Sequence, residues 1–402
     1  MTTDHDIVIS GGGVAGLTAA AVFGTAGHSV LLCDPAPPVT EGEAEGADLR
    51  TTAFLQPARG LLEDAGLWSR LADHAAPLRV MRIVDAGGPP PEPRVTRDFD
   101  AADISSGPFG WNLPNWLLRR EMLGRLDDLP NVDFRPGTGT ETLLTREREA
   151  RVGLSDGSRV RCRLVIAADG RTSPMREAAG IGVRTTRYGQ KALAFAVTHP
   201  IPHENVSTEI HRSGGPFTLV PLPDREGLPC SAVVWMEDGP EALRLSRLPE
   251  PAFEAAMMER SCGLFGPLTL VTRRSVWPIV TQVADRMAGE RIALLAEAAH
   301  VVPPIGAQGL NMSLGDLRCL RDLAAARPEG LGDRRMLETY DRRRHPEVRL
   351  RAAGIDALNR ASRISAQPLR DLRAAGLAAL YGAPPVRRML MQMGLGARGG
   401  ED

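Results

Sequence analysis

Several residue types that carry chemistry are scarce or scattered in this chain of 402 residues. Its five cysteines show no CxxC spacing and its eight histidines show no HExxH pair, so no zinc site, redox dithiol or disulfide framework is expected. Of the 48 basic residues only Lys191 is a lysine, which indicates a coding bias toward arginine. With a formal net charge of -1, the chain shows no footprint for nucleic acid.

Signals for secretion or membrane insertion are also lacking. Residues 1–6 are polar and carry no basic segment, so we expect no signal peptide and a cytoplasmic location. Residues 7–33 carry no charge except on a protonated His28 and mimic a membrane span, but three consecutive glycines interrupt them. Strand, tight turn, helix and strand therefore fit this stretch better than a transmembrane helix.

The N-terminal stretch predicts a dinucleotide-binding unit of the Rossmann-like type. In order, it contains strand 6–10, Gly11, Gly13 and Gly16 in a GxGxxG pattern, helix 14–26, strand 29–33 and Asp34. Gly11 permits the tight turn, and Gly13 lets the backbone approach a pyrophosphate. Gly16 lets the helix pack closely on the strand, and Asp34 can accept hydrogen bonds from a ribose diol. A purely structural glycine turn is the alternative.

A second glycine- and proline-rich segment spans residues 293–316. We expect a buried strand that ends near Glu297, a loop, and a helix that begins near Gly309. Such a loop leaves backbone N–H groups free to face a negatively charged ligand. We therefore expect this segment to close over the cofactor held by the N-terminal glycine turn.

Between these segments the pattern predicts two further units. A β meander over 140–168 ends at Asp169, where a parallel strand of an α/β fold places ligand contacts. Ser173 and Pro174 predict the start of a helix there. Short strands at 192–198, 207–211, 217–222 and 230–236 then predict an antiparallel sheet.

Helices and one further strand complete the expected elements. Arg50 precedes an expected helix with Leu55, Leu61, Leu62 and Leu67 on its apolar side. The other expected elements are helices 117–129, 239–263, 310–326, 335–362 (interrupted near Pro346) and 384–396, and a strand over 268–280. Phe109, Trp111 and Trp116 stand close together in a chain with only 4% aromatic residues, so they either line a pocket for an aromatic ring or pack in the core.

Three of these features, in this order, resemble the class A FAD-dependent aromatic monooxygenases. They are the glycine motif with its acid, Asp169-Gly170, and the late motif at 303–311. Within that class the chain is similar to the hydroxylases of ubiquinone biosynthesis (UbiH/UbiF type) through residues 48–53, 110–118, 168–173, 215–222 and 298–311. It departs from that family at Ala296-Glu297, where the family usually has Gly-Asp.

The resemblance implies a mixed α/β (α+β) fold, in which a Rossmann-like FAD-binding domain is interleaved with an antiparallel-sheet substrate domain and followed by C-terminal helices. The FAD-binding domain is expected to comprise residues 1–72, 108–185 and 272–350. The substrate domain is expected to comprise 73–107 and 186–271, and the C-terminal helical segment 351–402.

The resemblance also implies roles for individual residues. The residues expected to bind FAD are Gly11, Gly13, Val14, Ala15, Gly16, Asp34, Arg50, Arg119, Asp169, Glu297, Pro304, Gly306, Gly309, Leu310 and Asn311. Those expected to contact substrate are Trp111, Phe217, Leu219 and Pro303. A solvated Arg50 is an open alternative. No catalytic base is assigned, because His300 is expected to be a structural residue beside the loop.

The implied activity is hydroxylation of an aromatic ring with FAD, O2 and NAD(P)H as a transient electron donor. A polyprenyl-phenol intermediate of ubiquinone biosynthesis is the expected substrate. Two alternatives stay open: a small soluble phenol, or a non-catalytic FAD-binding scaffold of a biosynthetic complex, motivated by Ala296-Glu297. The helix at 384–396 either packs on the body or docks on a partner or on the inner face of a membrane.

Overall fold

The structure of the protein is a computed structural model that describes residues 3–88, 90–212, 214–363, 381 and 384–395. The helices are α1 (Val14–Thr25), α2 (Gln56–Asp64), α3 (Trp68–Leu71), α4 (Asn115–Asp127), α5 (Pro174–Ala178), α6 (Gly239–Ser246), α7 (Glu250–Arg260), α8 (Gln308–Ala326), α9 (Arg334–Ser362) and α11 (Pro384–Leu395). The strands up to the middle of the chain are β1 (Thr3–Ser10), β2 (Val30–Asp34), β3 (Thr51–Leu55), β4 (Ala76–Leu78), β5 (Val80–Gly87), β6 (Glu92–Asp100), β7 (Gly110–Pro114), β8 (Val132–Pro136), β9 (Thr140–Thr145), β10 (Ala150–Leu154) and β11 (Arg159–Ala167). The later strands are β12 (Val183–Thr198), β13 (Val206–His211), β14 (Pro216–Arg225), β15 (Leu228–Asp238), β16 (Thr269–Leu270), β17 (Ser275–Ala284), β18 (Ala288–Gly289), β19 (Ile292–Leu294) and β20 (His300–Val301).

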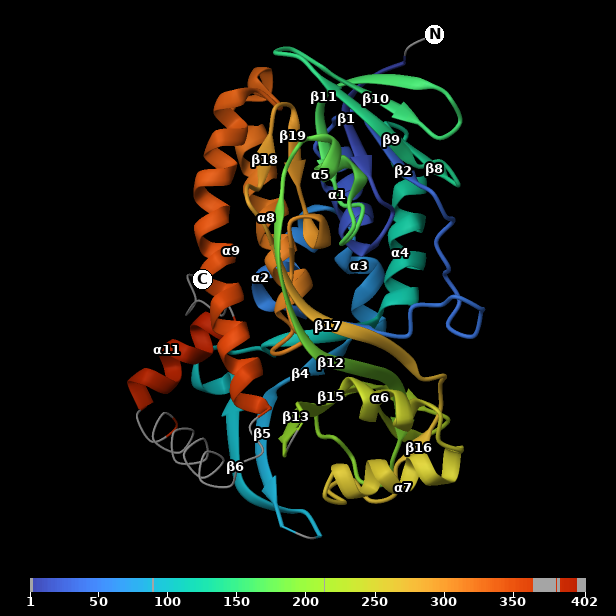
Figure 1. Ribbon diagram of the computed structural model, residues 1–402, viewed down its shortest axis with the longest axis vertical. Helices are drawn as coiled ribbons and strands as arrows, with labels where there is room; N and C mark the ends of the chain where they lie inside the picture. The colour runs from blue at the N-terminus through green and yellow to red at the C-terminus, as the bar shows by residue number, and fades with distance from the viewer. Residues whose placement is uncertain (1–2, 89, 213, 364–380, 382–383, 396–402) are drawn as a thin grey trace.

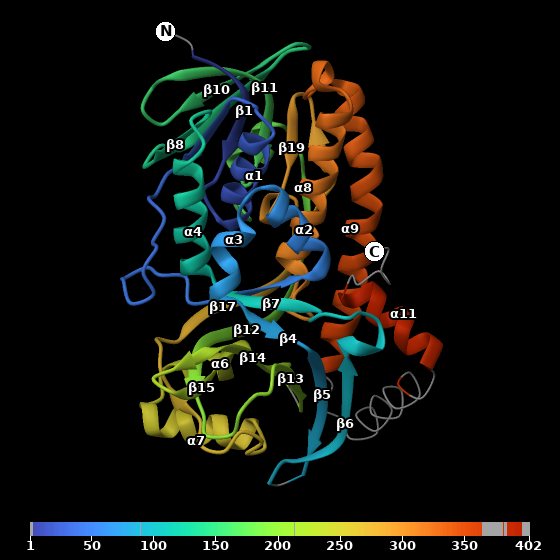
Figure 2. The same cartoon turned by 180° about the vertical axis from the view of Figure 1, so that it is seen from behind.

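Two large sheets divide the molecule into two halves. An eight-stranded sheet has the order β18-β19-β11-β1-β2-β8, and β10 and β9 extend it from β11. A nine-stranded sheet has the order β20-β17-β12-β15-β14-β13-β5-β6. The three strands β3, β7 and β4 form a small sheet between them (Figures 1 and 2). The chain passes back and forth between the halves, and the predicted domain boundaries stay a prediction.

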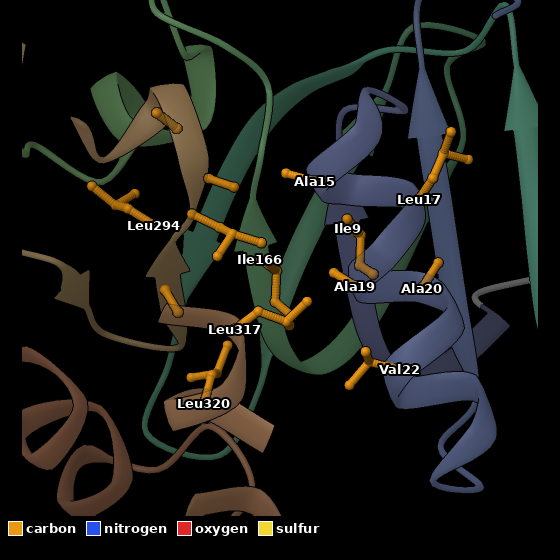
Figure 3. Close-up of a cluster of buried hydrophobic side chains, with 14 of the residues drawn as sticks. Ile9, Ala15, Leu17, Ala19, Ala20, Val22, Ile166, Leu294, Leu317 and Leu320 are labelled. Carbon is orange, nitrogen blue, oxygen red and sulfur yellow. The ribbon is translucent and has the colours of Figure 1, made fainter. Parts of the chain in front are cut away.

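The core of the first half forms around parallel strands that are buried on both sides. In β1, Ile7, Val8 and Ile9 are fully buried, which explains why this strand is a continuous apolar run. Helix α1 is buried along nearly its whole length and packs beside β1, and α8 packs against α1 on the same core (Figure 3). Burial all round α1 explains the uncharged stretch that mimicked a membrane span.

The nine-stranded sheet has two different faces. Its outer face packs on α6 and α7 through a second core that includes Phe195, Phe217, Trp235 and Phe253. Its inner face is turned toward the first half, because Ala192 and Met236 belong to the main core. Side chains alternate between these faces along each strand, so neighbouring residues serve different halves of the molecule.

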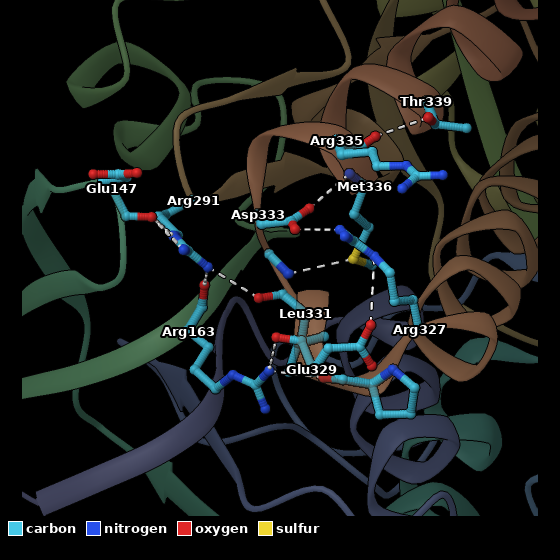
Figure 4. A network of polar contacts seen from close by, with 12 residues as sticks. Glu147, Arg163, Arg291, Arg327, Glu329, Leu331, Asp333, Arg335, Met336 and Thr339 are labelled. Atoms are coloured by element: carbon cyan, nitrogen blue, oxygen red, sulfur yellow. Dashed lines mark hydrogen bonds and ion pairs between the residues drawn. The ribbon is translucent and has the colours of Figure 1, made fainter.

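Helix α9 is tied to the first half at the end of the sheet where β19 begins. Arg291, just before β19, donates to the carbonyl oxygen of Glu147 and, at 3.0 Å, to that of Leu331 in the turn before α9 (Figure 4). In the same network Arg327 forms an ion pair with Asp333, the N-cap residue of α9. These contacts lie at the edge opposite the carboxyl ends of the parallel strands, so they stabilise the scaffold and not the ligand edge.

Four expected elements were wrong in detail. The expected strand 268–280 is two strands, β16 and β17, because residues 271–274 form no strand. Residues 51–55 form strand β3 and not the start of a helix, because they pair with β7, and helix α2 begins only at Gln56 with Pro57 in its first turn. The expected helix 239–263 is two helices, since Pro249 disfavours helical backbone before it. Helix α9 continues through Pro346, whose exposed position lets water bond the carbonyl group that loses its partner.

The expected apolar face of the C-terminal helix is only partly described. Helix α11 is present, but the side chains of Val386, Leu390 and Met393 lie outside the described residues. Whether α11 packs on the body of the protein or docks on a partner or a membrane therefore stays open.

Candidate functional site

The glycine turn after β1 has the geometry that a phosphate cradle requires. Gly11 has φ +105°, and a Cβ on it would lie 2.4 Å from the carbonyl oxygen of Ala168. A Cβ on Gly16 would lie 1.8 Å from the carbonyl oxygen of Gly11, so both glycines are needed for close packing. Gly13 differs, since a Cβ there would meet nothing within 4 Å. Gly13 also caps α1 without a side-chain hydrogen bond, which leaves the N–H groups of Val14 and Ala15 open to an anion.

Asp34, at the carboxyl end of β2, is held beside this turn by two backbone groups. The N–H of Gly12 donates to its Oδ2 at 2.5 Å, and the N–H of Ala36 donates to its Oδ1 at 2.9 Å. Each carboxylate oxygen has a second lone pair and can accept a further hydrogen bond from a hydroxyl group.

Asp169 joins the same edge because β11 lies parallel to β1. A Cβ on Gly11 would lie 2.9 Å from Cα of Asp169. The Asp169 carboxylate accepts from Ser173 Oγ at 2.5 Å and from the N–H of Met175 at 3.0 Å. Burial raises the pKa of Asp169, although these hydrogen bonds act in the opposite direction. The carboxylate therefore orients the start of α5.

The loop before α8 forms a second open helix N-terminus. Gly306 and Ala307 both have positive φ, +62° and +55°, and Ala307 caps α8 without a side-chain hydrogen bond. Gly309 is exposed, and Leu310 packs against the main core. Asn311 accepts from the N–H of Leu55 at 2.9 Å, so the helix start is fastened to β3. Pro304 is half-buried and Pro303 is buried in this loop.

Arg50 is partly exposed but belongs to an ionic cluster that is centred on the largely buried carboxylate of Asp48. It donates to both oxygens of Asp48, at 2.8 and 2.7 Å. Asn115 donates to the same carboxylate at 2.9 Å, and Arg119 lies 3.6 Å from it. The hydrogen bond with Asp48 raises the pKa of Arg50, and the negative charge of Glu297 contributes. The cluster therefore joins β3, α4 and the end of β19.

Asp48 and Asn115 were missed as site residues by the sequence interpretation. Burial favours the neutral acid, but hydrogen bonds from Arg50 and Asn115, together with the charge of Arg119, lower the pKa of Asp48. The spacing of Asp48 and Arg50, two residues apart before a strand, is the only local signal for this pair. Asn115 is 67 residues from Asp48, so only the fold reveals their contact.

The expected substrate residues are not all brought to this region. Phe217 and Leu219 are fully buried on the outer face of the nine-stranded sheet, in the core under α6 and α7. Their neighbours Thr218 and Val220 lie on the inner face, as the alternation of a strand requires. Trp111 packs edge-on against Trp68 with ring centroids 5.2 Å apart, which is the packing alternative.

His300 lies beneath the α8 loop as part of a buried ionic network. Its Nε2 lies 2.7 Å from Asp316 Oδ2, and Arg344 Nε donates to Asp316 Oδ1 at 2.6 Å. Both His300 and Asp316 have fully buried side chains. The arrangement holds the loop against α8 and α9, in agreement with the expected structural role.

The residues at this edge fit FAD. Two helix N-termini, at Gly13 and Ala307, lack side-chain caps and can bind the negative charge of a diphosphate or a flavin ring. Asp34 stands where an adenosine ribose would follow the diphosphate. Among the described residues no group of three or more histidines, cysteines or acids could hold a metal ion.

Comparisons with known proteins agree with this arrangement. Residues 4–353 match the family described as FAD binding domain. The chain is 34% identical to ubiquinone hydroxylase UbiL of Rhodospirillum rubrum over 97% of its own length and 89% of that protein. It is 25% identical to 3-demethoxyubiquinol 3-hydroxylase of Escherichia coli, covering 97% and 98% of the two chains.

Solved structures show the same fold. The crystal structure of p-nitrophenol 4-monooxygenase PnpA from Pseudomonas putida matches with a TM-score of 0.80 at 20% identity, over 99% of this chain and all of that one. The mixed α/β fold and FAD as the cofactor are therefore confirmed. The chain belongs to the FAD binding domain family, among the FAD-dependent aromatic monooxygenases that include the ubiquinone hydroxylases.

Proposed function

We propose that this enzyme hydroxylates the ring of a polyprenyl-phenol intermediate of ubiquinone biosynthesis, with NAD(P)H as electron donor. The observation that carries the proposal is the 34% identity with a ubiquinone hydroxylase along nearly the whole chain. The inner face of the nine-stranded sheet supports it, because small and apolar side chains are gathered there: Ala194, Ala196, Val220, Ala232 and Val234. Such a face suits an aromatic ring that carries an apolar tail.

The chain's own residues bind, orient and exclude water. Gly13 and the start of α1 would hold the diphosphate, and Asp34 the adenosine ribose. The loop from Pro303 to Gly309 would lie along the flavin, while Arg50, fixed by Asp48, adds positive charge beside it. When bound, FAD supplies electron transfer from NAD(P)H and activation of O2. The protein side of the reaction is therefore positioning, which explains why no catalytic triad is visible in the sequence.

Two phenols distinguish a prenylated substrate from the first alternative, a small soluble phenol. Purified enzyme with FAD and NADH is offered 2-geranylphenol and unprenylated phenol at equal concentration, and hydroxylated products are quantified. We expect hydroxylation of the prenylated ring at least about tenfold faster, because burial of each CH₂ group adds about 0.8 kcal/mol of binding. Activity on the unprenylated ring alone would reject the ubiquinone assignment and favour a soluble phenol.

The scaffold alternative rests on Ala296-Glu297. Glu297 keeps the negative charge and lies within the electrostatic influence of Arg50, which favours retained FAD binding. Stopped-flow mixing of the FAD-loaded protein with NADH or NADPH checks this. We expect bleaching of the flavin absorbance, and a flavin that neither donor reduces, with or without phenol, would favour the scaffold.

A contact with the membrane surface forms part of the proposal, because a polyprenylated substrate resides there. No helix among the described residues has the length and apolar character to cross a bilayer. On the outer side of α9, however, Leu350 and Leu358 are 71% and 58% exposed, and Arg343 and Arg349 are exposed nearby. Exposed apolar residues flanked by arginines suit an anionic lipid surface.

Vesicle flotation tests this contact. We expect the protein to float with anionic vesicles and not with zwitterionic ones, and the double variant Leu350→Ser/Leu358→Ser to float less. Leu144→Ser/Leu228→Ser, at two leucines elsewhere that are 45% and 49% exposed, serves as the control. Equal flotation of both double variants would remove α9 as the contact.

A further inference from the structure

We propose that His211, held by Glu209, is the group that contacts the hydroxyl of the aromatic substrate and accepts its proton. The inference rests on the proposed function only in that the substrate is a phenol. Both residues belong to β13, two positions apart, so their side chains leave the strand on the same side.

Strand register places this pair on the inner face of the nine-stranded sheet. Glu209 pairs with Thr218 of β14, and Thr218 pairs with Val234 of β15. Val234 packs against the main core of the FAD-binding half. The residues between them, Thr208 and Ile210, point to the opposite face, where Ile210 joins the core under α6 and α7. The Glu209–His211 pair is therefore turned toward the cofactor half and not toward the outer helices.

Two sets of contacts connect this face with the cofactor edge. On one side, Val220 and Met81 pack with Ala53 and Leu55 of β3, to which Asn311 at the start of α8 is hydrogen-bonded. Val220 and Met81 lie one row of side chains away from Glu209, at a distance of about 7 Å.

On the other side, a row of residues paired across neighbouring strands starts at His211 and leads toward Arg50. His211 pairs with Pro216, and at the far end of the row Ala192 pairs with Trp277. The guanidinium of Arg50 lies 5.8 Å from the centre of the Trp277 ring. The inner face of the nine-stranded sheet therefore meets the cofactor edge at two places, at β3 and near Arg50.

The middle of this face is open, unlike the opposite one. Thr218, Val220, Val234 and Ile83 are half-buried, whereas the outer-face residues of the same strands are buried. Half-buried apolar residues in the middle of the molecule are expected where a ligand completes the packing.

The close contact between His211 and Glu209 determines which ring nitrogen of His211 can accept a proton. Its Nε2 lies 2.7 Å from Glu209 Oε1, in a pair whose side chains are only 15% and 6% exposed. A carboxylate only accepts, so Nε2 carries the hydrogen and Nδ1 of the neutral ring carries the lone pair. No hydrogen-bond partner of Nδ1 is found in the described part of the chain. A phenol hydroxyl can donate to it.

The proton transfer balances without any further reagent. The phenol O–H bond breaks, its electron pair stays on the oxygen, and an N–H bond forms at Nδ1. The imidazolium is stabilised by the carboxylate of Glu209, as a histidine is by an acid in hydrolase triads. The phenolate is richer in electrons at the ring carbons and attacks an electrophilic oxygen more readily. Asp85, at the paired position on β5, adds a second acid near the ring.

Three variants separate a catalytic role from a structural one. In His211→Gln we expect hydroxylation of 2-geranylphenol to fall about a hundredfold or more. Reduction of the bound FAD by NADH without phenol is expected to stay unchanged. Glu209→Gln is expected to give a smaller loss, because the ring loses its anchor but keeps Nδ1. His203→Gln, in the loop before β13 and bonded to the carbonyl of Leu222, is expected to behave as the parent.

The pH dependence gives a readout that a folding defect would not reproduce. The residual rate of His211→Gln is expected to rise toward about pH 10, as phenol ionises in solution, while the parent rate has reached its plateau. The methyl ether of the substrate has no proton to give, so parent and His211→Gln should bind it equally. A low rate that stays flat with pH would overturn the assignment.

A turnover-free measurement keeps the inference testable if 2-geranylphenol is not a substrate. 4-Nitrophenol is titrated with the parent and His211→Gln proteins below the pKa of the phenol, and the visible absorbance of its phenolate is recorded. We expect more phenolate with the parent than with His211→Gln. Equal signals, including none from either protein, would refute the role of His211, whereas absence of turnover alone would refute only the substrate.

Discussion

Asn311 at the start of α8 donates to the carbonyl oxygen of Ala53 across 2.7 Å, although 258 residues separate them. The same amide nitrogen donates to the carbonyl of Ala307, also at 2.7 Å, and the amide oxygen accepts from Leu55. One side chain thus joins the left-handed cap of α8 to β3. This contact fixes the loop that we expect along the flavin.

Asn311→Asp is expected to break this link, because a carboxylate cannot donate and would face two carbonyl oxygens. We expect a loss of about 2 kcal/mol in the free energy of unfolding and weaker FAD binding by the folded protein. Chemical denaturation and fluorescence titration with FAD measure the two effects. In Asn131→Asp, which loses donors to Gly24 and His28, stability should fall without a change in FAD affinity. Equal FAD affinities for the two variants would contradict the role of Asn311.

Gly13 and Gly16 are expected to respond to alanine in opposite ways. In Gly16→Ala the new methyl group collides with the carbonyl of Gly11, which should destabilise the FAD-free protein by about 3 kcal/mol. Gly13→Ala meets no atom of the protein and should change stability by less than about 0.5 kcal/mol. It should nevertheless weaken FAD binding at least about tenfold, because the methyl group occupies the approach of the diphosphate. Thermal unfolding without FAD and titration with FAD distinguish these outcomes, and full affinity in Gly13→Ala would place the diphosphate elsewhere.

Ala296→Gly should stabilise the protein. Ala296 has φ +55°, a left-handed conformation that costs an L-residue about 1–2 kcal/mol and glycine nothing. The greater freedom of glycine in the unfolded chain offsets about 0.5–1 kcal/mol, so the free energy of unfolding should rise by an amount between about 0 and 1.5 kcal/mol. Ala298→Gly, at a buried position with ordinary φ, should lose stability. The free energy of unfolding in denaturant decides between them, and a loss in both variants would contradict the strain at Ala296.

Glu297→Ala should weaken FAD retention, because the exposed carboxylate stands at the cofactor edge next to Arg50. Glu250→Ala, at the start of α7 on the outer face of the nine-stranded sheet, removes an exposed acid away from this edge and serves as the control. Bound FAD per protein after gel filtration is the measurement. If both variants retain as much FAD as the parent, Glu297 does not contact the cofactor.

Asp48 should make the stability of the protein depend on pH. Its folded pKa lies below the unfolded value of 3.8. The ionised carboxylate therefore stabilises the fold above that value, and this contribution disappears as the pH falls through the folded pKa. Asp48→Asn should be less stable than the parent at neutral pH, and the difference should shrink in acid. Urea unfolding across this range provides the check, and a constant difference would mean that the charge of Asp48 contributes nothing.

The sequence by itself determined the parts that are local. The order of strand, glycine turn, helix, strand and acid from Ile7 to Asp34 is continuous in the chain, so hydrophobic periodicity and glycine spacing predict it. The same holds for the alternating strands β13 to β15 and for the resemblance to flavin monooxygenases. Strand 51–55 was mistaken for helix because its partner β7 lies more distant in the sequence, and local propensity does not reveal such a pairing.

Only the tertiary structure decided which residues share a site. The contact between Asp48 and Asn115, the bond from Asn311 to β3, and the face on which His211 and Glu209 stand all depend on pairings across long loops. A shift of one residue in strand register would turn Phe217 inward and Thr218 outward. The sequence therefore specified the cofactor, while the packing of the two sheets determined which side chains of the nine-stranded sheet face the cofactor half.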